Sequence, residues 1–463
     1  MFQKEVYFQR RGDLRKILGG GLILIPGNID SPFNYPSNPY SFRQDSTFLY
    51  FFGLKKPGFV GIIDADSGED TIYADDFDMD GIIWMGKMKS VKEQAESVGV
   101  SKSFPLYLLD SVIKKALQSG RRIHYLPPYR AETKIQLHEL LGIPVPELKS
   151  NASPDLIKAV VSLREVKSAL EIAEMEQATD IAYLMHTTAM KMAKPGVCEQ
   201  EIAGAVEGIS LANGGPVSFP IILSQNVHIL HNHYHDKNLV SGNLLVVDAG
   251  HENQNHYTSD ITRTFPVSGK FTQKQKEIYE IVLAANDNVR QAVKPGVFYR
   301  DLHILAARTM AQGLKDLGIM KGDIEQAVAA GAHALFYPHG LGHMIGLDVH
   351  DMEGLGENFV GYDNTVSRSN QFGFAFLRLA KKLKAGFTIT NEPGIYFIHD
   401  LIDLWKSENK HSEFINYDKV EQYRDFTGVR IEDDILVTET GSKVIGKPIP
   451  KTVKEIEDLM QNI

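Results

Sequence analysis

The sequence contains little cysteine, no long hydrophobic run and no excess of positive charge. One cysteine, Cys198, excludes an internal disulfide, which suits a reducing compartment. The longest early apolar run, Leu22–Ile25, is far too short to span a bilayer, and the first residues carry charges where a signal peptide needs an apolar core. The formal net charge of -9 argues against nucleic-acid and anionic-membrane partners. We expect a soluble cytoplasmic protein.

At 463 residues, the chain is too long for one ordinary hydrophobic core and predicts two domains. Ser153-Pro154-Asp155 has the serine cap and early proline of a helix start, and helical spacing of apolar residues continues from there towards Pro195. We therefore predict a smaller α/β domain over 1–160 and a second domain over 165–455. For the first domain we expect these elements: helices Val6–Leu18, Val91–Ser97 and Asp110–Ser119, and strands Leu22–Pro26, Thr47–Phe52, Phe59–Ile63 and Ile72–Ala74.

A four-residue sequence occurs twice in the second domain. Lys194–Val197 and Lys294–Val297 both read KPGV, and each lies between two long amphipathic helical patterns. This arrangement predicts a duplicated unit. A duplicated domain is expected to place its site between the halves, where facing strands converge.

The stretch Asn243–Val267 is typical of a buried hairpin. Leu244–Val247 is an apolar run that ends on Asp248, and an alternating run after a polar bend contains Asp260. If the bend centres near Gln254, the two aspartates lie opposite each other with Cβ atoms about 5 Å apart. Buried carboxylates that close must share a proton or a cation, whereas solvated ones need neither.

Further ionisable residues follow in equally apolar, strand-like runs. His343 closes HGLGH, Glu392 follows the run Phe387–Thr390, and Glu432 lies in the alternating run GVRIEDDILV. Carboxylates with one imidazole form a hard, oxygen-rich ligand set that suits Mn²⁺ or Mg²⁺ and tolerates Zn²⁺, Fe²⁺ or Co²⁺. With Asp248 and Asp260 they are too many for one tetrahedral zinc and predict a two-metal site.

These motifs resemble those of the "pita-bread" metallopeptidases, and in particular the aminopeptidase P and prolidase branch. The resemblance covers about residues 165–450 and rests on DAG, SDITRTFP, HGLGH, GLDVHD, EPGIYF and GVRIEDD. FRQDSTFLYFFG, at 42–53, resembles the N-terminal domain of the same branch, which methionine aminopeptidases lack. The resemblance implies an α+β fold: a small α/β domain followed by a catalytic domain of duplicated α/β halves with a curved antiparallel sheet.

The resemblance also implies a role for each ligand. Asp248 would chelate one metal, and His343 and Glu392 would hold the other, while Asp260 and Glu432 would bridge the two. Two cations would activate a water for attack on the carbonyl before proline. The expected cofactors are two divalent ions, with Mn²⁺ first and Zn²⁺, Co²⁺ or Fe²⁺ as alternatives. A dimer or tetramer is expected.

Other roles follow from the same resemblance. Glu392 would also carry a proton to the proline nitrogen, His231 and His350 would line the substrate site, and His339 and Arg430 would support the active site. From the residues alone, Arg430 could equally be only a salt-bridge partner of a neighbouring ligand or have a direct role in binding the substrate. The spacing of Asp248 and Asp260 is one residue longer than is usual in the family, so the bend holds an extra residue and the opposed pairing is provisional.

The predicted function is therefore exopeptidase cleavage between an N-terminal residue and proline. The long insert between Glu392 and Glu432 resembles that of prolidases, which take Xaa-Pro dipeptides. Arg378 resembles the prolidase arginine that receives the dipeptide carboxylate, a task that suits its fork of donors. The alternative is an aminopeptidase P, which acts on longer peptides, and a more remote one is a catalytically silent binding protein on the same fold.

One further alternative concerns a group of histidines. A separate zinc cluster and a single substrate histidine, His231, among polar loop residues are both compatible with the sequence. The histidines in question are His228, His231, His233 and His235.

Overall fold

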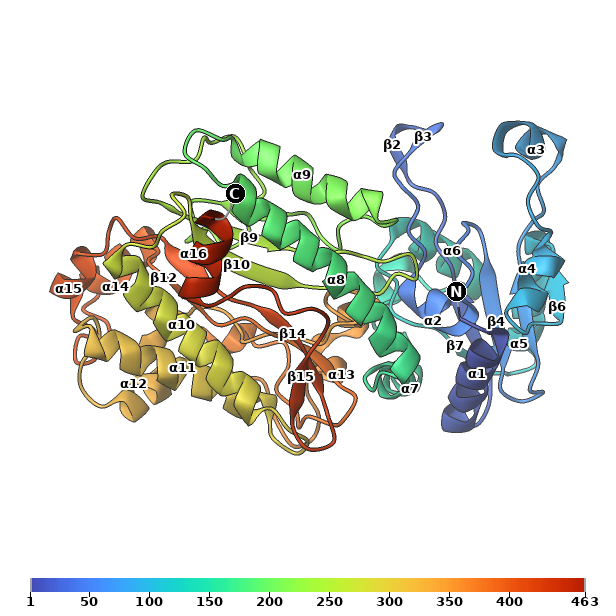
Figure 1. The fold of residues 1–463 in the computed structure, drawn as a ribbon. Helices are drawn as coiled ribbons and strands as arrows, with labels where there is room; N and C mark the ends of the chain where they lie inside the picture. The colour runs from blue at the N-terminus through green and yellow to red at the C-terminus, as the bar shows by residue number, and fades with distance from the viewer. Residues whose placement is uncertain (1, 462–463) are drawn as a thin grey trace. The chain divides into compact units, whose positions relative to one another are not determined.

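A computed structural model describes residues 2–461, which divide into two compact units (Figure 1). The first unit contains the chain up to Arg164 and the segment Gly354–Phe359, and the second contains Glu165–Glu353 and the chain from Val360 onward. No helix in the described part of the chain is both long enough and apolar enough to cross a membrane.

The first unit is built around a five-stranded mixed sheet in the order β6-β5-β4-β1-β7. β1 pairs antiparallel with β4 and parallel with β7. The strands of this unit are β1 (Leu22–Pro26), β2 (Pro32–Tyr35), β3 (Asn38–Pro39), β4 (Val60–Asp64), β5 (Asp70–Tyr73), β6 (Lys102–Phe104) and β7 (Ile123–His124). Its helices are α1 (Lys4–Leu18), α2 (Ser46–Phe52), α3 (Met79–Met85), α4 (Val91–Ser97), α5 (Leu109–Gln118), α6 (Ala131–Leu141) and α7 (Pro154–Arg164).

Two sequence-based predictions in this region were wrong. The apolar run Thr47–Phe52 is part of helix α2 and not a strand, because the Asp45 side chain caps the helix by accepting from Phe48 N at 2.9 Å. A short apolar run does not by itself distinguish a buried strand from a buried helix. The helical pattern from Pro154 is also interrupted: α7 ends at Arg164, and Ser168 begins a new helix with a capping box.

The second unit consists of two similar halves. In each half two helices pack side by side, α8 against α9 and α10 against α11, as Figure 1 shows. The KPGV turns between them are held in the same way, since Gly196 N donates to Leu239 O and Gly296 N donates to Leu383 O, both at 2.8 Å. These helices are α8 (Ala169–Met192), α9 (Glu199–Ala212), α10 (Gln273–Ala292) and α11 (Tyr299–Asp316).

Each half also contributes a three-stranded antiparallel sheet, β10-β9-β8 in one half and β11-β14-β15 in the other. β10 joins the halves, because its Thr262 O accepts from Glu432 N at 3.0 Å and its Thr264 Oγ1 accepts from Arg430 N at 3.1 Å. The strands are β8 (Ile222–Ser224), β9 (Leu244–Ala249), β10 (Ile261–Pro266), β11 (Thr388–Asn391), β12 (Gly394–Tyr396), β13 (Gly428–Arg430), β14 (Asp433–Val437) and β15 (Ser442–Val444).

Shorter helices complete the second unit. α14 and α15 lie within the long insert between Glu392 and Glu432. The remaining helices are α12 (Ile324–Ala330), α13 (Glu357–Val360, which crosses the boundary between the units), α14 (His399–Ser407), α15 (Tyr417–Glu421) and α16 (Val453–Gln461). Every residue of β9 and β10 is buried, so the duplicated core surrounds the strands that carry ionisable residues.

Candidate metal centre and active site

The β9–β10 hairpin places two aspartates on one face, but not directly opposite each other. Asp248 pairs with Thr262, and the register continues so that Asp260 lies across from Gly250. The bend therefore centres one residue later than predicted, and the opposed pairing of the two aspartates was wrong. They remain diagonal neighbours on the same face of the hairpin, within reach of one another. A Cβ on Gly250 would lie 1.7 Å from Ser259 O, so glycine permits this close strand approach.

The second half brings its ligand candidates in from loops and strand ends. Glu392 directly follows β11, and Glu432 lies in the break between β13 and β14. His343 does not lie on a strand as predicted: its neighbour Met344 forms only an isolated bridge with Ile389 of β11. Gly342 has φ 157°, and a Cβ there would meet Thr390 Oγ1 at 2.4 Å, so glycine lets this loop approach β11.

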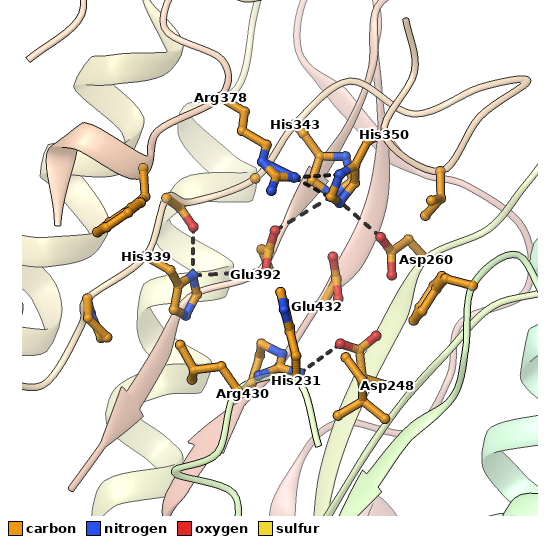
Figure 2. A pocket seen from close by; sticks show the side chains of 18 of the residues that line it. His231, Asp248, Asp260, His339, His343, His350, Arg378, Glu392, Arg430 and Glu432 are labelled. Carbon is orange, nitrogen blue, oxygen red and sulfur yellow. Dashed lines mark hydrogen bonds and ion pairs between the residues drawn. The ribbon is translucent and has the colours of Figure 1, made fainter. Parts of the chain in front are cut away.

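The ten residues to which the resemblance gave a metal, catalytic or substrate role all line one pocket of the second unit, with a volume of about 550 Å³ (Figure 2). They come from both halves and are His231, Asp248, Asp260, His339, His343, His350, Arg378, Glu392, Arg430 and Glu432. The other lining residues are largely apolar, among them Phe219, Ile222, Phe372, Phe376 and Leu401. A pocket with apolar walls and a few convergent polar groups is the usual form of a small-ligand site.

Within this pocket the five predicted ligands form two groups that share Glu432. Ligand atoms of Asp248, Asp260 and Glu432 lie within 4.8 Å of one another, and so do those of His343, Glu392 and Glu432. Asp260 also lies close to the second group, since its Oδ2 is 3.4 Å from His343 Nε2. Two groups joined through shared carboxylates match the ligand arrangement that a pair of cations needs.

Burial disfavours the charged form of three of these carboxylates. Burial, followed by the charge of Asp248, raises the pKa of Asp260 well above its usual value. Burial and then Asp260 raise the pKa of Glu392 to about 8, and the same causes raise that of Glu432 well above its usual range. Asp248 Oδ1 is buried and accepts no hydrogen bond from the described residues. A bound cation would satisfy that oxygen and stabilise all four negative charges.

His343 is oriented to complete this set. Its Nδ1 lies 3.0 Å from Met344 O and donates to it, so Nε2 carries the lone pair. That Nε2 faces Asp260 Oδ2 at 3.4 Å and Glu392 Oε1 at 3.8 Å. Burial lowers the pKa of His343 to about 4, so the ring is neutral at physiological pH, which is the form that binds metals.

Arg430 forms another part of the pocket wall and donates hydrogen bonds to three side chains. Its Nη2 donates to Asp248 Oδ2 at 2.7 Å, its Nη1 donates to Tyr396 Oη at 3.1 Å and its Nε donates to Thr262 Oγ1 at 3.1 Å. Tyr396 Oη lies in turn 2.9 Å from His339 Nε2. Arg430 is therefore at least the ion-pair partner of a ligand, as one of the two sequence interpretations held.

His350 and Arg378 form a third side of the pocket together with Glu353. Glu353 Oε2 lies 2.5 Å from His350 Nδ1 and 3.1 Å from Arg378 Nη1. Arg378 Nη1 lies 3.2 Å from His350 Nε2 as well. Burial lowers the pKa of His350 to about 4, so this imidazole is also neutral.

The four histidines between positions 228 and 235 are dispersed rather than gathered. His233 Nδ1 lies 3.3 Å from Ile221 O, and His235 Nδ1 lies 3.0 Å from Leu223 O. His228 stacks on His399 with ring centroids 5.5 Å apart. His231 and His233 line the pocket, which agrees better with a substrate role than with a zinc cluster.

Sequence reasoning missed four residues that hold the site together. Thr262 Oγ1 donates to Glu432 Oε2 at 2.7 Å, and Asp434 Oδ2 accepts from Asp260 N at 3.0 Å. The other two are Tyr396 and Glu353, described above. Thr262 could have been found from its period-two spacing with Asp260, and Tyr396 from its place in EPGIYF. Asp434 could likewise have been found from its place in GVRIEDD, two residues after Glu432, whereas the contacts of Glu353 leave no such local signal.

Comparison with known proteins identifies the family. A model described as "Metallopeptidase family M24" matches residues 173–439, and one described as "Aminopeptidase P, N-terminal domain" matches residues 7–124. The chain belongs to metallopeptidase family M24. It is 31% identical to the Xaa-Pro dipeptidase of Homo sapiens over 96% of this chain and 89% of that protein. It is also 31% identical, over 96% of this chain and 92% of the relative, to a Fusarium vanettenii protein named "Probable Xaa-Pro aminopeptidase".

Solved M24 structures agree with this assignment. A variant of Escherichia coli aminopeptidase P in complex with substrate superimposes with a TM-score of 0.82 at 29% identity, covering 100% of this chain and 99% of that one. A zinc-substituted form of the same enzyme in complex with product gives 0.81 at 29% identity, again over 100% and 99%. The predicted family and fold, a small α/β domain followed by a pita-bread domain, are confirmed.

This M24 protein is a metallopeptidase that binds divalent metal, and its pocket fits that requirement. Because burial raises the pKa of Asp260, Glu392 and Glu432, that of Glu392 to about 8, metal binding must displace protons from this group of carboxylates. We expect metal uptake at pH 7 to release protons, measurable by titration calorimetry in buffers with different ionisation enthalpies. Proton release that is absent in all buffers would contradict the raised carboxylate pKa values.

The same pKa values predict the pH dependence of stability. In the unfolded chain a glutamate releases its proton near pH 4.5, whereas the folded metal-free protein keeps the Glu392 proton up to about pH 8. The folded state then binds more protons than the unfolded state in this window, so its stability falls as pH rises from about 5 to about 8. We expect the melting temperature of chelator-treated protein to fall over this range, and Mn²⁺ to reverse the fall.

Proposed function

We propose that this protein is a two-metal Xaa-Pro peptidase that prefers dipeptides, with Mn²⁺ as its metal. The Xaa-Pro peptidase class is supported by the dipeptidase and aminopeptidase P relatives, which align over nearly the whole chain. The preference for dipeptides rests on one observation: the guanidinium of Arg378 lies in the pocket wall, beside the neutral imidazole of His350. A guanidinium at this position can receive the carboxylate of an Xaa-Pro dipeptide.

The proposed metal ligands are the five residues in the two groups. Asp248 would hold one ion, His343 and Glu392 the other, and Asp260 and Glu432 both. Four carboxylates with one imidazole favour Mn²⁺ over softer ions. When bound, such a pair of ions lowers the pKa of water and polarises a carbonyl.

The residues of the chain supply the remaining steps. Glu392 has the highest exposure of the five ligands, with a side chain 20% exposed, and a pKa of about 8 in the metal-free protein. A carboxylate that is exposed towards the substrate can carry a proton to the nitrogen of proline as the bond breaks. His231 and His350, neutral and on opposite sides of the pocket, can donate to or accept from the peptide (Figure 2). His339 supports the pocket wall, since its Nε2 lies 2.9 Å from Tyr396 Oη, the hydroxyl that also accepts from Arg430.

Aminopeptidase activity on longer peptides is the second candidate. The observation that favours it is the pocket volume of about 550 Å³, which leaves room beyond a dipeptide. Hydrolysis of Ala-Pro and Ala-Pro-Ala with Mn²⁺ supplied separates the two. Cleavage largely confined to Ala-Pro would support the dipeptidase, and comparable release of alanine from the tripeptide would support the aminopeptidase. If neither peptide is cleaved and no metal is retained after Mn²⁺ addition, the result would favour the catalytically silent binding protein.

Replacing Arg378 with alanine tests its proposed role. The variant loses a charge-assisted hydrogen bond to the dipeptide carboxylate, so we expect KM for Ala-Pro to rise about tenfold or more. KM for Ala-Pro-Ala should change less than about threefold, because its carboxylate lies one residue further out. Arg300→Ala, which removes an exposed arginine of α11, should leave both values unchanged. Equal increases for both substrates in the Arg378 variant would exclude the role.

We also propose that the protein is cytoplasmic and forms a dimer or tetramer. The single cysteine is compatible with a reducing compartment. Exposed aromatic side chains in the first unit, among them Phe33, Tyr35 and Trp84, are compatible with burial against a second copy. Light scattering coupled to size-exclusion chromatography tests the oligomeric state.

A further inference from the structure

One carboxylate contacts both substrate-facing groups on the third side of the pocket. Glu353 begins a short 3₁₀ helix (Glu353–Leu355), and its Oε2 accepts from His350 Nδ1 at 2.5 Å and from Arg378 Nη1 at 3.1 Å. Of the described residues, His350 and Arg378 line the pocket and Glu353 does not. Glu353 therefore lies beside the two side chains that line the pocket and forms an ion pair with Arg378.

The negative charge of Glu353 weakens the attraction of Arg378 for an anionic ligand. The side chains of Glu353 and Arg378 are 40% and 34% exposed, so water and salt weaken their interaction without removing it. The hydrogen bond from His350 lowers the pKa of Glu353, which is consequently an anion at neutral pH. A peptide carboxylate that approaches Arg378 meets the attraction of the guanidinium and the repulsion of Glu353 together.

We propose that Glu353 is a specificity-determining residue that limits the preference for peptides with a free carboxylate after proline. Its negative charge offsets part of the positive charge of Arg378, so a dipeptide binds less tightly than it would if Glu353 carried no charge. A peptide that is extended or blocked after proline brings no carboxylate to this point and is unaffected. The inference rests on the proposed role of Arg378 and deepens it.

The substitution Glu353→Gln distinguishes an effect of the charge of Glu353 from an effect of its hydrogen bonds to His350 and Arg378. The glutamine side chain has the same shape, and its amide oxygen can still accept from His350 and Arg378, but it carries no charge. If Glu353 acted only as an anchor, Glu353→Gln would leave selectivity unchanged or reduce it. If the charge matters, the variant should bind free carboxylates more tightly.

The test compares Ala-Pro with Ala-Pro-amide in the Mn²⁺-loaded full-length protein. The selectivity is the kcat/KM for Ala-Pro divided by the kcat/KM for the amide, and any effect through His350 that both substrates share cancels in this ratio. We expect Glu353→Gln to raise the ratio about three- to fivefold, mainly by lowering KM for Ala-Pro. Added salt should raise KM for Ala-Pro more steeply in this variant than in the parent, because Arg378 then attracts the dipeptide carboxylate with more of its charge and salt screens that attraction.

Controls separate this inference from the function on which it rests. Glu413→Gln removes an exposed charge that does not line the pocket and should not change the ratio. In an Arg378→Ala background, Glu353→Gln should add nothing to the ratio. Glu353→Ser, a smaller uncharged replacement, must raise the ratio as well and serves if the glutamine variant does not fold.

An unchanged or lower ratio in the folded Glu353 variants overturns the inference. If Arg378→Ala lowers the ratio while Glu353→Gln does not raise it, only the role of Glu353 fails. If Arg378→Ala leaves the ratio unchanged, Arg378 does not receive the carboxylate and the proposed dipeptide preference itself fails.

Discussion

Replacing Asp260 with asparagine is expected to lower kcat for Ala-Pro on the order of a thousandfold. Asp260 belongs to the group with Asp248 and also reaches the other group, with its Oδ2 3.4 Å from His343 Nε2. An amide keeps the shape but cannot provide the charge that holds a bridging position between two cations. Loss of one cation removes several kcal/mol of transition-state stabilisation, which corresponds to a factor of about 10³ or more. Activity assays and metal analysis by mass spectrometry measure both effects.

The same variant has an opposite effect on the metal-free protein. Asp260 is buried beside Asp248, and its pKa is raised well above the usual value by burial and then by that neighbour. Removing a group that resists ionisation should leave the chelator-treated protein at least as stable as the parent. Asp301→Asn, an exposed aspartate of α11, serves as the control and should change neither metal content nor activity. A variant that retains two ions per chain and full activity contradicts the ligand role.

Replacing Arg263 with methionine is expected to destabilise the protein by about 3–5 kcal/mol. This fully buried arginine of β10 donates to Asp433 Oδ1 at 2.7 Å, to Glu432 O at 2.6 Å and to Ile449 O at 3.1 Å. Although burial alone would raise the pKa of Asp433, Arg263 and Lys451 lower it to about 2. Without Arg263, the Asp433 charge and several carbonyl groups lose a buried donor.

Urea denaturation of the chelator-treated protein measures this loss. Adding Asp433→Asn to the Arg263 variant should recover part of the lost stability, because it removes the poorly compensated charge. Arg300→Met, at an exposed ion pair with Asp301, should cost less than about 1 kcal/mol. Because Arg263 holds the backbone of the proposed ligand Glu432, the Arg263 variant should also bind metal more weakly. A loss of stability below 1 kcal/mol would show that the Arg263 network adds little.

Much of the site could be predicted from the sequence because each candidate ligand lies in a short, recognisable motif. Asp248 ends an apolar strand, Glu392 follows another, and His343 closes a glycine-rich motif, so each residue type and its setting are visible without a structure. The repeated KPGV turns likewise indicated the two similar halves. Their equivalent hydrogen bonds to Leu239 O and Leu383 O bear out that duplication.

Predictions failed where two conformations fit the same local pattern. The run Thr47–Phe52 suits a buried strand or a buried helix, and the cap from Asp45 decides for the helix. Whether Asp248 and Asp260 pair across the hairpin depended on where the bend centres. The bend lies one residue later than predicted, so Asp248 pairs with Thr262 instead of Asp260. Periodicity gives the face of a strand reliably and its exact partner poorly.

The sequence by itself determined the types of the ligands, their distribution over two similar halves and the family. Only the tertiary structure decided which residues support them. Glu353 lies 25 positions before Arg378, and Arg263 lies 170 positions before Asp433, yet each pair shares a hydrogen bond. The physical reason is that hydrophobic periodicity and turn chemistry act over a few neighbouring residues. Contacts between distant segments depend instead on strand register and on the packing of the whole core.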